Sequence, residues 1–241
     1  MGNTQLNDVT ISPILEQPNK VLNSKVFSYD SEHLWQSGMF RIFLSHISSH
    51  RIAVSQLKEA FIEFGVSCFV AHEDIEPTSE WQREIELSLK SMHALVALLT
   101  PDFPASKWTD QEVGFALGKG LLVIPVRLGL DPYGFIGKFQ GATGKLDKPN
   151  SLASGIVDLL LKNHKTALMM SDALVVALEK SRSNSTAIDV SKKVDGLTNL
   201  TLDQLTRLDN ACKINRQVAQ ASGVAKRIQN IIKRFKPSET V

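Results

Sequence analysis

The chain alternates compact apolar runs with longer segments in which apolar residues recur every three or four positions. Runs of four to eight apolar residues have the length of buried strands, and a three-to-four residue spacing is that of an amphipathic helix. Strands that alternate with helices predict a parallel sheet covered on both faces. The predicted strands are 41–45, 66–71, 93–100, 121–128 and a weak fifth near 139–143. The predicted helices of this part lie near 54–64, 81–89, 107–118 and 151–163.

The two flanks of this alternating region have a different character. Before it, no period is sustained, which indicates an arm with a short helix around 30–37. After it, helical spacing continues to a Ser-rich segment, 181–186, that we interpret as a linker, and 188–234 predicts two or three short helices. Thr201 and Gln204 have the spacing of a capping box. The predicted organisation is an arm over 1–38, an α/β domain over 39–163 and a helical extension over 164–241.

Composition and charge limit the environment and the partners of the chain. Hydrophobic residues make up 43% and charged residues 22%, which is ordinary for a globular protein. No apolar run is long enough for a membrane span, and no signal peptide is recognisable at the start, so a cytoplasmic protein is expected. From residue 182 onward there are 11 Lys and Arg against 5 Asp and Glu. Such a basic excess can contact nucleic acid, but it is more often a solvated helix face, so nucleic acid is not an expected partner.

Several common chemistries lack their sequence signatures. There is no GxxxxGK[ST] phosphate loop, no GxGxxG after the first strand and no GxSxG nucleophile elbow. None of the six histidines stands at metal-ligand spacing from another histidine or a cysteine. We therefore expect neither a bound metal nor a resident cofactor. In doubly wound sheets ligands bind outside the carboxyl ends of the strands, which directs attention to 45–50, 72–80, 101–112 and 129–139.

A spaced set of residues in these segments carries a family resemblance. It consists of IFLSHIS (42–48), CFVAHEDIEP (68–77), TPDFPASKW (100–108), the motif Trp108-x-x-x-Glu112 and ALGKGLLVIPV (116–126). In this order and spacing the set resembles the TIR domain family, particularly its bacterial members that cleave NAD. The resemblance implies a flavodoxin-like, five-stranded parallel sheet, to which this chain adds a C-terminal α-helical extension.

The resemblance also implies a site. It assigns the catalytic role to Glu112, the glutamate of the W-x-x-x-E motif. Residues 72–80 correspond to a loop that shapes the nucleotide pocket and helps self-assembly; where the family usually has a glycine in it, this chain has Pro77-Thr78-Ser79. The implied substrate-binding residues are Ser45, His46, Ala71, His72, Ile75, Trp108 and Tyr133.

One carboxylate is chemically sufficient for this reaction. Breaking the bond from ribose to nicotinamide gives an oxocarbenium-like transition state, as in glycoside cleavage. Nicotinamide leaves as a neutral molecule, so only the developing positive charge needs stabilisation. Trp108 lies one turn before Glu112 and could stack on a planar ring. A purely structural role remains open for each residue: Glu112 as a surface residue, Trp108 as a core residue, and Ser45 and His46 as residues that cap the loop with hydrogen bonds.

Three functions are compatible with the sequence. The first is an NAD glycohydrolase or ADP-ribosyl cyclase in bacterial anti-phage defence or signalling, whose product a separate effector could sense. The second is a non-enzymatic adaptor that acts by TIR–TIR assembly, and the third is a virulence factor acting on host TIR signalling. The first is favoured because an adaptor has no chemical need for Glu112. The short helices of the extension need a partner surface. The partner surface is that of the TIR domain, of the arm or of a second subunit. We favour the second subunit and therefore expect a homo-oligomer.

Overall fold

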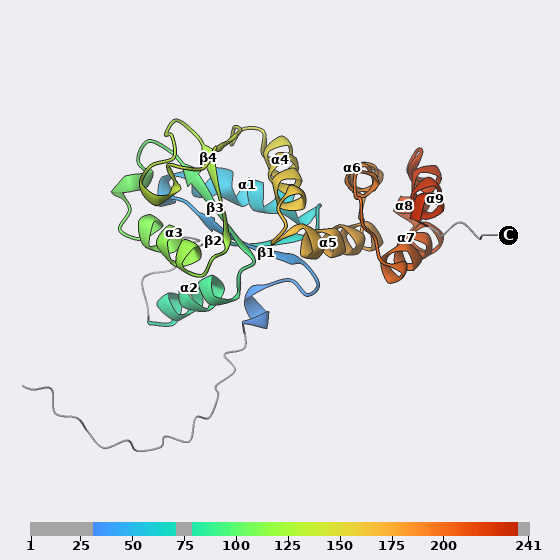
Figure 1. Cartoon of the computed structure of the whole chain (residues 1–241), viewed down its shortest axis with the longest axis horizontal. Helices are drawn as coiled ribbons and strands as arrows, with labels where there is room; N and C mark the ends of the chain where they lie inside the picture. Colours follow the sequence, from blue (N-terminus) through green and yellow to red (C-terminus); the bar gives the residue numbers. More distant parts are fainter. Residues whose placement is uncertain (1–30, 71–78, 236–241) are drawn as a thin grey trace, which may run out of the picture.

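The computed structural model describes residues 31–70 and 79–235. In this part of the chain, five parallel strands form one sheet in the order β2-β1-β3-β4-β5. This order confirms the predicted flavodoxin-like fold. Figure 1 shows the sheet with helices on both sides. Within the described residues, no helix is both long enough and apolar enough to pass through a lipid bilayer. The strands are β1 (Phe40–Ser45), β2 (Val66–Val70), β3 (Ala94–Leu99), β4 (Leu122–Arg127) and β5 (Ala142–Thr143).

Helices cover both faces of the sheet and divide its core in two. Successive side chains of a strand point to opposite faces. Ile42 and Leu44 of β1 therefore pack with α1, α4 and α5, whereas Phe43 packs with α2 and α3. Ser45 shares the face of Phe43, which directs the last side chain of β1 toward α3. The helices are α1 (Arg51–Ile62), α2 (Ser79–Ser91), α3 (Thr109–Gly118), α4 (Pro149–Lys162) and α5 (Ala167–Glu179).

The described part of the N-terminal arm packs against the sheet domain. The helix predicted around 30–37 is a single 3-10 turn, η1 (Glu32–Leu34). The Trp35 side chain that follows it is buried, and its indole N–H donates to the Ser91 hydroxyl at 2.9 Å. The backbone N–H of Gln36 donates to the Ser67 hydroxyl at 3.1 Å. The last residues of the arm are thus part of the domain surface.

The extension contains more helix than the sequence predicted. Up to residue 235, where the description of the chain ends, four helices follow α5, where two or three were expected: α6 (Asn184–Asp195), α7 (Leu202–Ile214), α8 (Arg216–Gln220) and α9 (Val224–Phe235). The presumed linker 181–186 contains the start of α6, because the Ser183 side chain accepts from the Thr186 N–H and caps the helix. The capping box predicted at Thr201 and Gln204 is confirmed.

The apolar stripes of the extension pack within the chain itself. Their buried members join a single core that is continuous with the sheet. The expected packing of these stripes against a second subunit is therefore wrong, because the helices of one chain bury them against each other and against α5. The stripe residues buried in this way are Leu197, Leu205, Leu208, Val218, Val224, Ile228 and Ile231.

Candidate active site

A serine and a glutamate meet in the protein interior at the carboxyl end of β1. Ser45 is the last residue of β1 and lies opposite Ala97 of the adjacent β3. Glu112 lies in the first turn of α3, the helix that follows β3. The Ser45 hydroxyl donates to Oε2 of Glu112 at 2.6 Å across 67 residues of sequence. The strand order therefore brings two of the predicted site residues into direct contact.

Glu112 is an unusual carboxylic acid. Its side chain is 2% exposed, and this burial raises its pKa from 4.5 to about 7, although the Ser45 hydrogen bond acts in the opposite direction. Among the described residues, no hydrogen-bond donor reaches its second oxygen, Oε1. A buried polar atom without a partner costs free energy that folding must offset. Residues held at such a cost are typical of functional sites rather than of packing.

Two tryptophans pack together beside this pair. Trp108, which directly precedes α3, is half-buried. Its ring meets that of the buried Trp81 edge to face, with centroids 5.5 Å apart and an interplanar angle of 86°. One surface of the Trp108 indole is thus occupied by a structural contact. Trp108 is therefore in part a packing residue. The exposed part of its indole is the part that a substrate ring could contact.

Tyr133 is tied to the same helix through an aspartate that the sequence did not single out. The phenol of Tyr133 donates to Oδ1 of Asp110 at 2.6 Å, and burial together with this hydrogen bond raises the pKa of Tyr133 well above its usual value. Asp110 lies in the first turn of α3, two residues before Glu112. That proximity was the only available signal, because nothing local indicates a partner 23 residues away.

The loops after β1 and β3 approach each other above the pair. His46 is buried, with Nδ1 3.1 Å from the carbonyl oxygen of Leu44. The Ser49 hydroxyl donates to Asp102 at 3.4 Å, and Nε2 of His50 lies 3.9 Å from the same carboxylate. These contacts hold the two loops together at the edge where the ligand rule placed the site.

Three predicted site residues cannot be placed. Ala71, His72 and Ile75 lie outside the described residues. Within residues 31–70 and 79–235, no three His, Cys, Asp or Glu side chains are grouped to hold a metal ion. The predicted site residues that the structure describes are Ser45, His46, Trp108, Glu112 and Tyr133.

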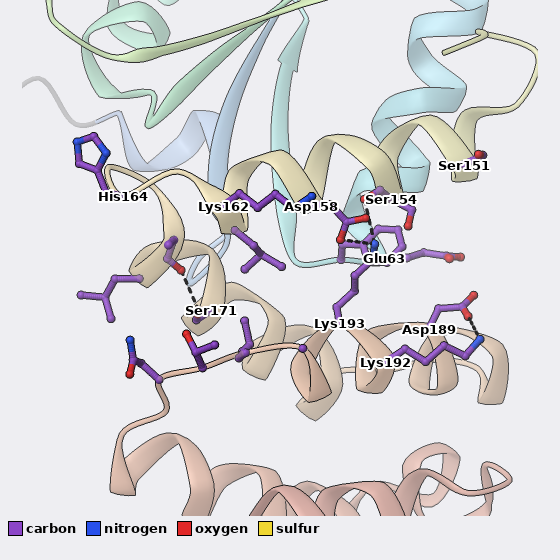
Figure 2. Close-up of a pocket in the computed structure, with 18 of the residues that line it drawn as sticks. Glu63, Ser151, Ser154, Asp158, Lys162, His164, Ser171, Asp189, Lys192 and Lys193 are labelled. Carbon is purple, nitrogen blue, oxygen red and sulfur yellow. Dashed lines mark hydrogen bonds and ion pairs between the residues drawn. The ribbon is translucent and has the colours of Figure 1, made fainter. Parts of the chain in front are cut away.

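A hollow of about 970 Å³ lies elsewhere, between α4, α5 and α6 (Figure 2). Lys193 crosses it, with Nζ 2.6 Å from Asp158 and 3.1 Å from the carbonyl oxygen of Ser154. Lys192 pairs with Asp189 at 2.9 Å on the same side. These ion pairs make the hollow a polar seam between the sheet domain and the extension. It contains none of the predicted site residues.

The region that contains the Ser45–Glu112 pair matches a known protein family. No curated protein matches the chain. The model of one protein family, described as TIR domain, matches residues 42–150. The matched range begins in β1, ends at the start of α4 and includes both Ser45 and Glu112. Residues 42–150 of this chain therefore form a domain of the TIR family.

Proposed function

We propose that the protein cleaves NAD between ribose and nicotinamide, with Glu112 as the catalytic carboxylate. The observation that carries the proposal is the buried Ser45–Glu112 pair, in which Oε1 has no donor among the described residues. A TIR adaptor has no use for a carboxylate that is costly to bury. An enzyme that stabilises positive charge does use such a carboxylate, because a negative charge attracts a positive charge more strongly where water is excluded.

The reaction needs little from the protein besides this carboxylate. The C–N bond breaks, its electron pair leaves with nicotinamide, and positive charge develops on the ribose ring. The Glu112 carboxylate stabilises that charge through Oε1 while Ser45 holds Oε2 in place. Attack at the ribose carbon by water gives ADP-ribose, and attack by a nitrogen of the adenine gives a cyclic isomer. The half-buried face of Trp108 is suited to hold a planar ring and so to bias this choice.

The test is direct. The purified full-length protein is incubated with NAD over a wide range of protein concentrations, and the products are separated by mass spectrometry. We expect nicotinamide to be released together with ADP-ribose or a cyclic isomer, and more steeply than linearly with protein concentration if TIR domains assemble. Glu112→Gln should be inactive, and Glu59→Gln, an exposed glutamate of α1, should be active.

Failure to consume NAD at any concentration would contradict the enzyme and support the adaptor, whose assembly is then measured by sedimentation. The same proposal includes a cytoplasmic location, a homo-oligomer and a role in defence or signalling, in which an effector reads the product.

A further inference from the structure

The last two described helices of the extension are connected as in a helix-turn-helix. Helix α8 ends at Gln220, residues 221–223 turn, and α9 begins at Val224. Gly223 in the turn has φ of +74°, a conformation that favours glycine. Two helices joined by a three-residue turn containing glycine are a common DNA-binding arrangement. Val218 on α8 and Ile228 on α9 are fully buried, so the apolar side of the pair faces α6 and α7.

The outward side of this unit is strongly basic. Residues 210–235 contain six Lys and Arg and no Asp or Glu. Carboxylates pair with some of these cations: Asp195 of α6 with Arg234, and Asp209 with Lys213 within α7. Arg227 donates to the Ser191 hydroxyl. A positive excess therefore remains at the end of the molecule that lies farthest from the sheet (Figure 1).

Three side chains form what we call the α9 face: Lys226, Asn230 and Lys233. All three are exposed, and their spacing of four and three residues places them along one side of the helix. No carboxylate of the described residues pairs with Lys226 or Lys233. Gln229 is excluded from the face because it donates to Asp209 at 2.8 Å. The α9 face thus offers two ammonium groups and one amide to a ligand.

These groups suit one class of macromolecule better than another. Lysines neutralise phosphates, an asparagine can pair with an adenine edge, and the major groove of B-form DNA admits an α-helix. A membrane surface is a poorer fit, because the apolar residues Val224, Ile228 and Ile231 of α9 are buried and cannot insert into lipid. From the geometry and charge we infer that the extension binds double-stranded DNA, with α9 in the major groove. Charge composition alone did not favour this partner.

The test measures binding of the full-length protein to a labelled duplex of about 25 base pairs, more than two helical turns. Fluorescence anisotropy is recorded between about 50 and 200 mM salt, and the logarithm of the binding constant is plotted against that of the salt concentration. Lys226→Ala with Lys233→Ala should reduce the slope by about two, one for each phosphate contact. Alanine keeps the helix, since it has the highest helix propensity.

Matched controls distinguish an effect of the α9 face from an effect of the net charge of the protein. Lys138→Ala with Lys145→Ala removes the same charge from exposed positions of the TIR domain and should leave the slope unchanged. Lys226→Arg with Lys233→Arg should retain the slope of the wild type. An RNA duplex of equal length should bind more weakly, because its major groove does not admit a helix.

Three results would overturn the inference. The first is an absence of DNA binding at low salt, including the case in which vesicles with anionic lipid are bound instead. The second is an equal loss of slope in the α9 and the control variants. The third is equal affinity for the RNA duplex. None of these readouts depends on NAD, so they test the extension independently of the proposed enzyme.

Discussion

Two titratable side chains stand at opposite ends of the sheet: Glu112 is buried, and His93 is half-buried. Glu112 lies at the carboxyl end of β1, and His93 lies at the amino end of β3. Burial raises the pKa of Glu112 to about 7 and lowers the pKa of His93 to about 4, with Arg41 contributing to the latter. Burial thus favours the neutral form of both groups.

The difference lies in how their hydrogen-bonding atoms are used. Nδ1 of the His93 ring accepts the backbone N–H of Arg41 at 3.1 Å, and the backbone N–H of His93 donates to the Arg41 carbonyl oxygen at 2.9 Å. The ring also packs edge to face on Phe40 with centroids 5.0 Å apart. Glu112 has one oxygen bound by Ser45 and the other without a donor among the described residues. His93 has a hydrogen-bond partner within the fold and so serves the structure. Glu112 has one oxygen without a donor among the described residues, and that oxygen is available to a substrate.

The largest expected effect is on catalysis by Glu112→Gln. The amide keeps the size of the side chain and removes its charge, so we expect NAD cleavage to fall by about 10²–10³-fold or more. His93→Gln should change the rate little, since the ring is far from Ser45 along the sheet. Initial rates of both variants measure the contrast. Equal losses would mean that both residues act through the fold, and the comparison would fail.

The pH dependence of the wild-type rate should report the ionisation of Glu112. Only the carboxylate stabilises the oxocarbenium, so kcat/KM should rise about tenfold per pH unit below the pKa and level off above about pH 7. The profile is measured with NAD at substrate concentrations well below KM. A rate independent of pH across this range would show that the charge of Glu112 is not used.

Ser45→Ala should have a smaller effect that sharpens the role of the pair. The Ser45 hydrogen bond lowers the pKa of Glu112, so its loss should move the midpoint of the pH profile upward. At neutral pH the rate should drop several-fold and recover in part at alkaline pH. Ser48→Ala, an exposed residue of the following loop, is the control and should keep the wild-type profile. A lower rate with an unmoved midpoint would limit Ser45 to a positional role.

The smallest expected effects are on stability, and they have opposite signs. Because the folded-state pKa of His93 lies below the ordinary 6.5, its contribution is present above pH 6.5 and lost as the pH falls toward about 4. Because that of Glu112 lies above 4.5, its contribution is present at acid pH and lost as the pH rises through about 7. Both windows lie between about pH 4 and 7, where the two contributions oppose each other. The slope of the unfolding temperature against pH in this range should therefore become more negative in His93→Gln and more positive in Glu112→Gln. The reverse pattern would contradict both assignments.

The sheet domain could be predicted because its signals are local. Each strand is a short apolar run, and β3, entirely buried, is predicted to within one residue at either end. The carboxyl-end rule also selected the segments that contain Ser45 and Glu112. Their hydrogen bond could not be predicted, because it depends on how the end of β1 and the first turn of α3 orient the two side chains toward each other.

The predictions that differ from the structure have physical reasons as well. Ser183 was interpreted as linker, although the same polar side chain that favours a loop also caps a helix. The contacts of Trp108 with Trp81 and of Tyr133 with Asp110 join separate elements, so neither leaves a periodic signal. The packing of the extension was misjudged because apolar stripes do not say which surface will cover them.

The contact at Gly65 decides how separable the two halves of the chain are. Its φ is +73°, and a Cβ there would lie 2.2 Å from the carbonyl oxygen of Ala173 in α5. The backbone of the extension thus touches the turn into β2 with no room for a single methyl group. Protein engineers who wish to graft this TIR domain elsewhere cannot cut at the family boundary, since doing so would strip α5 from the sheet and expose core. Insertion of a flexible linker is better placed after α5, where the chain leaves the sheet.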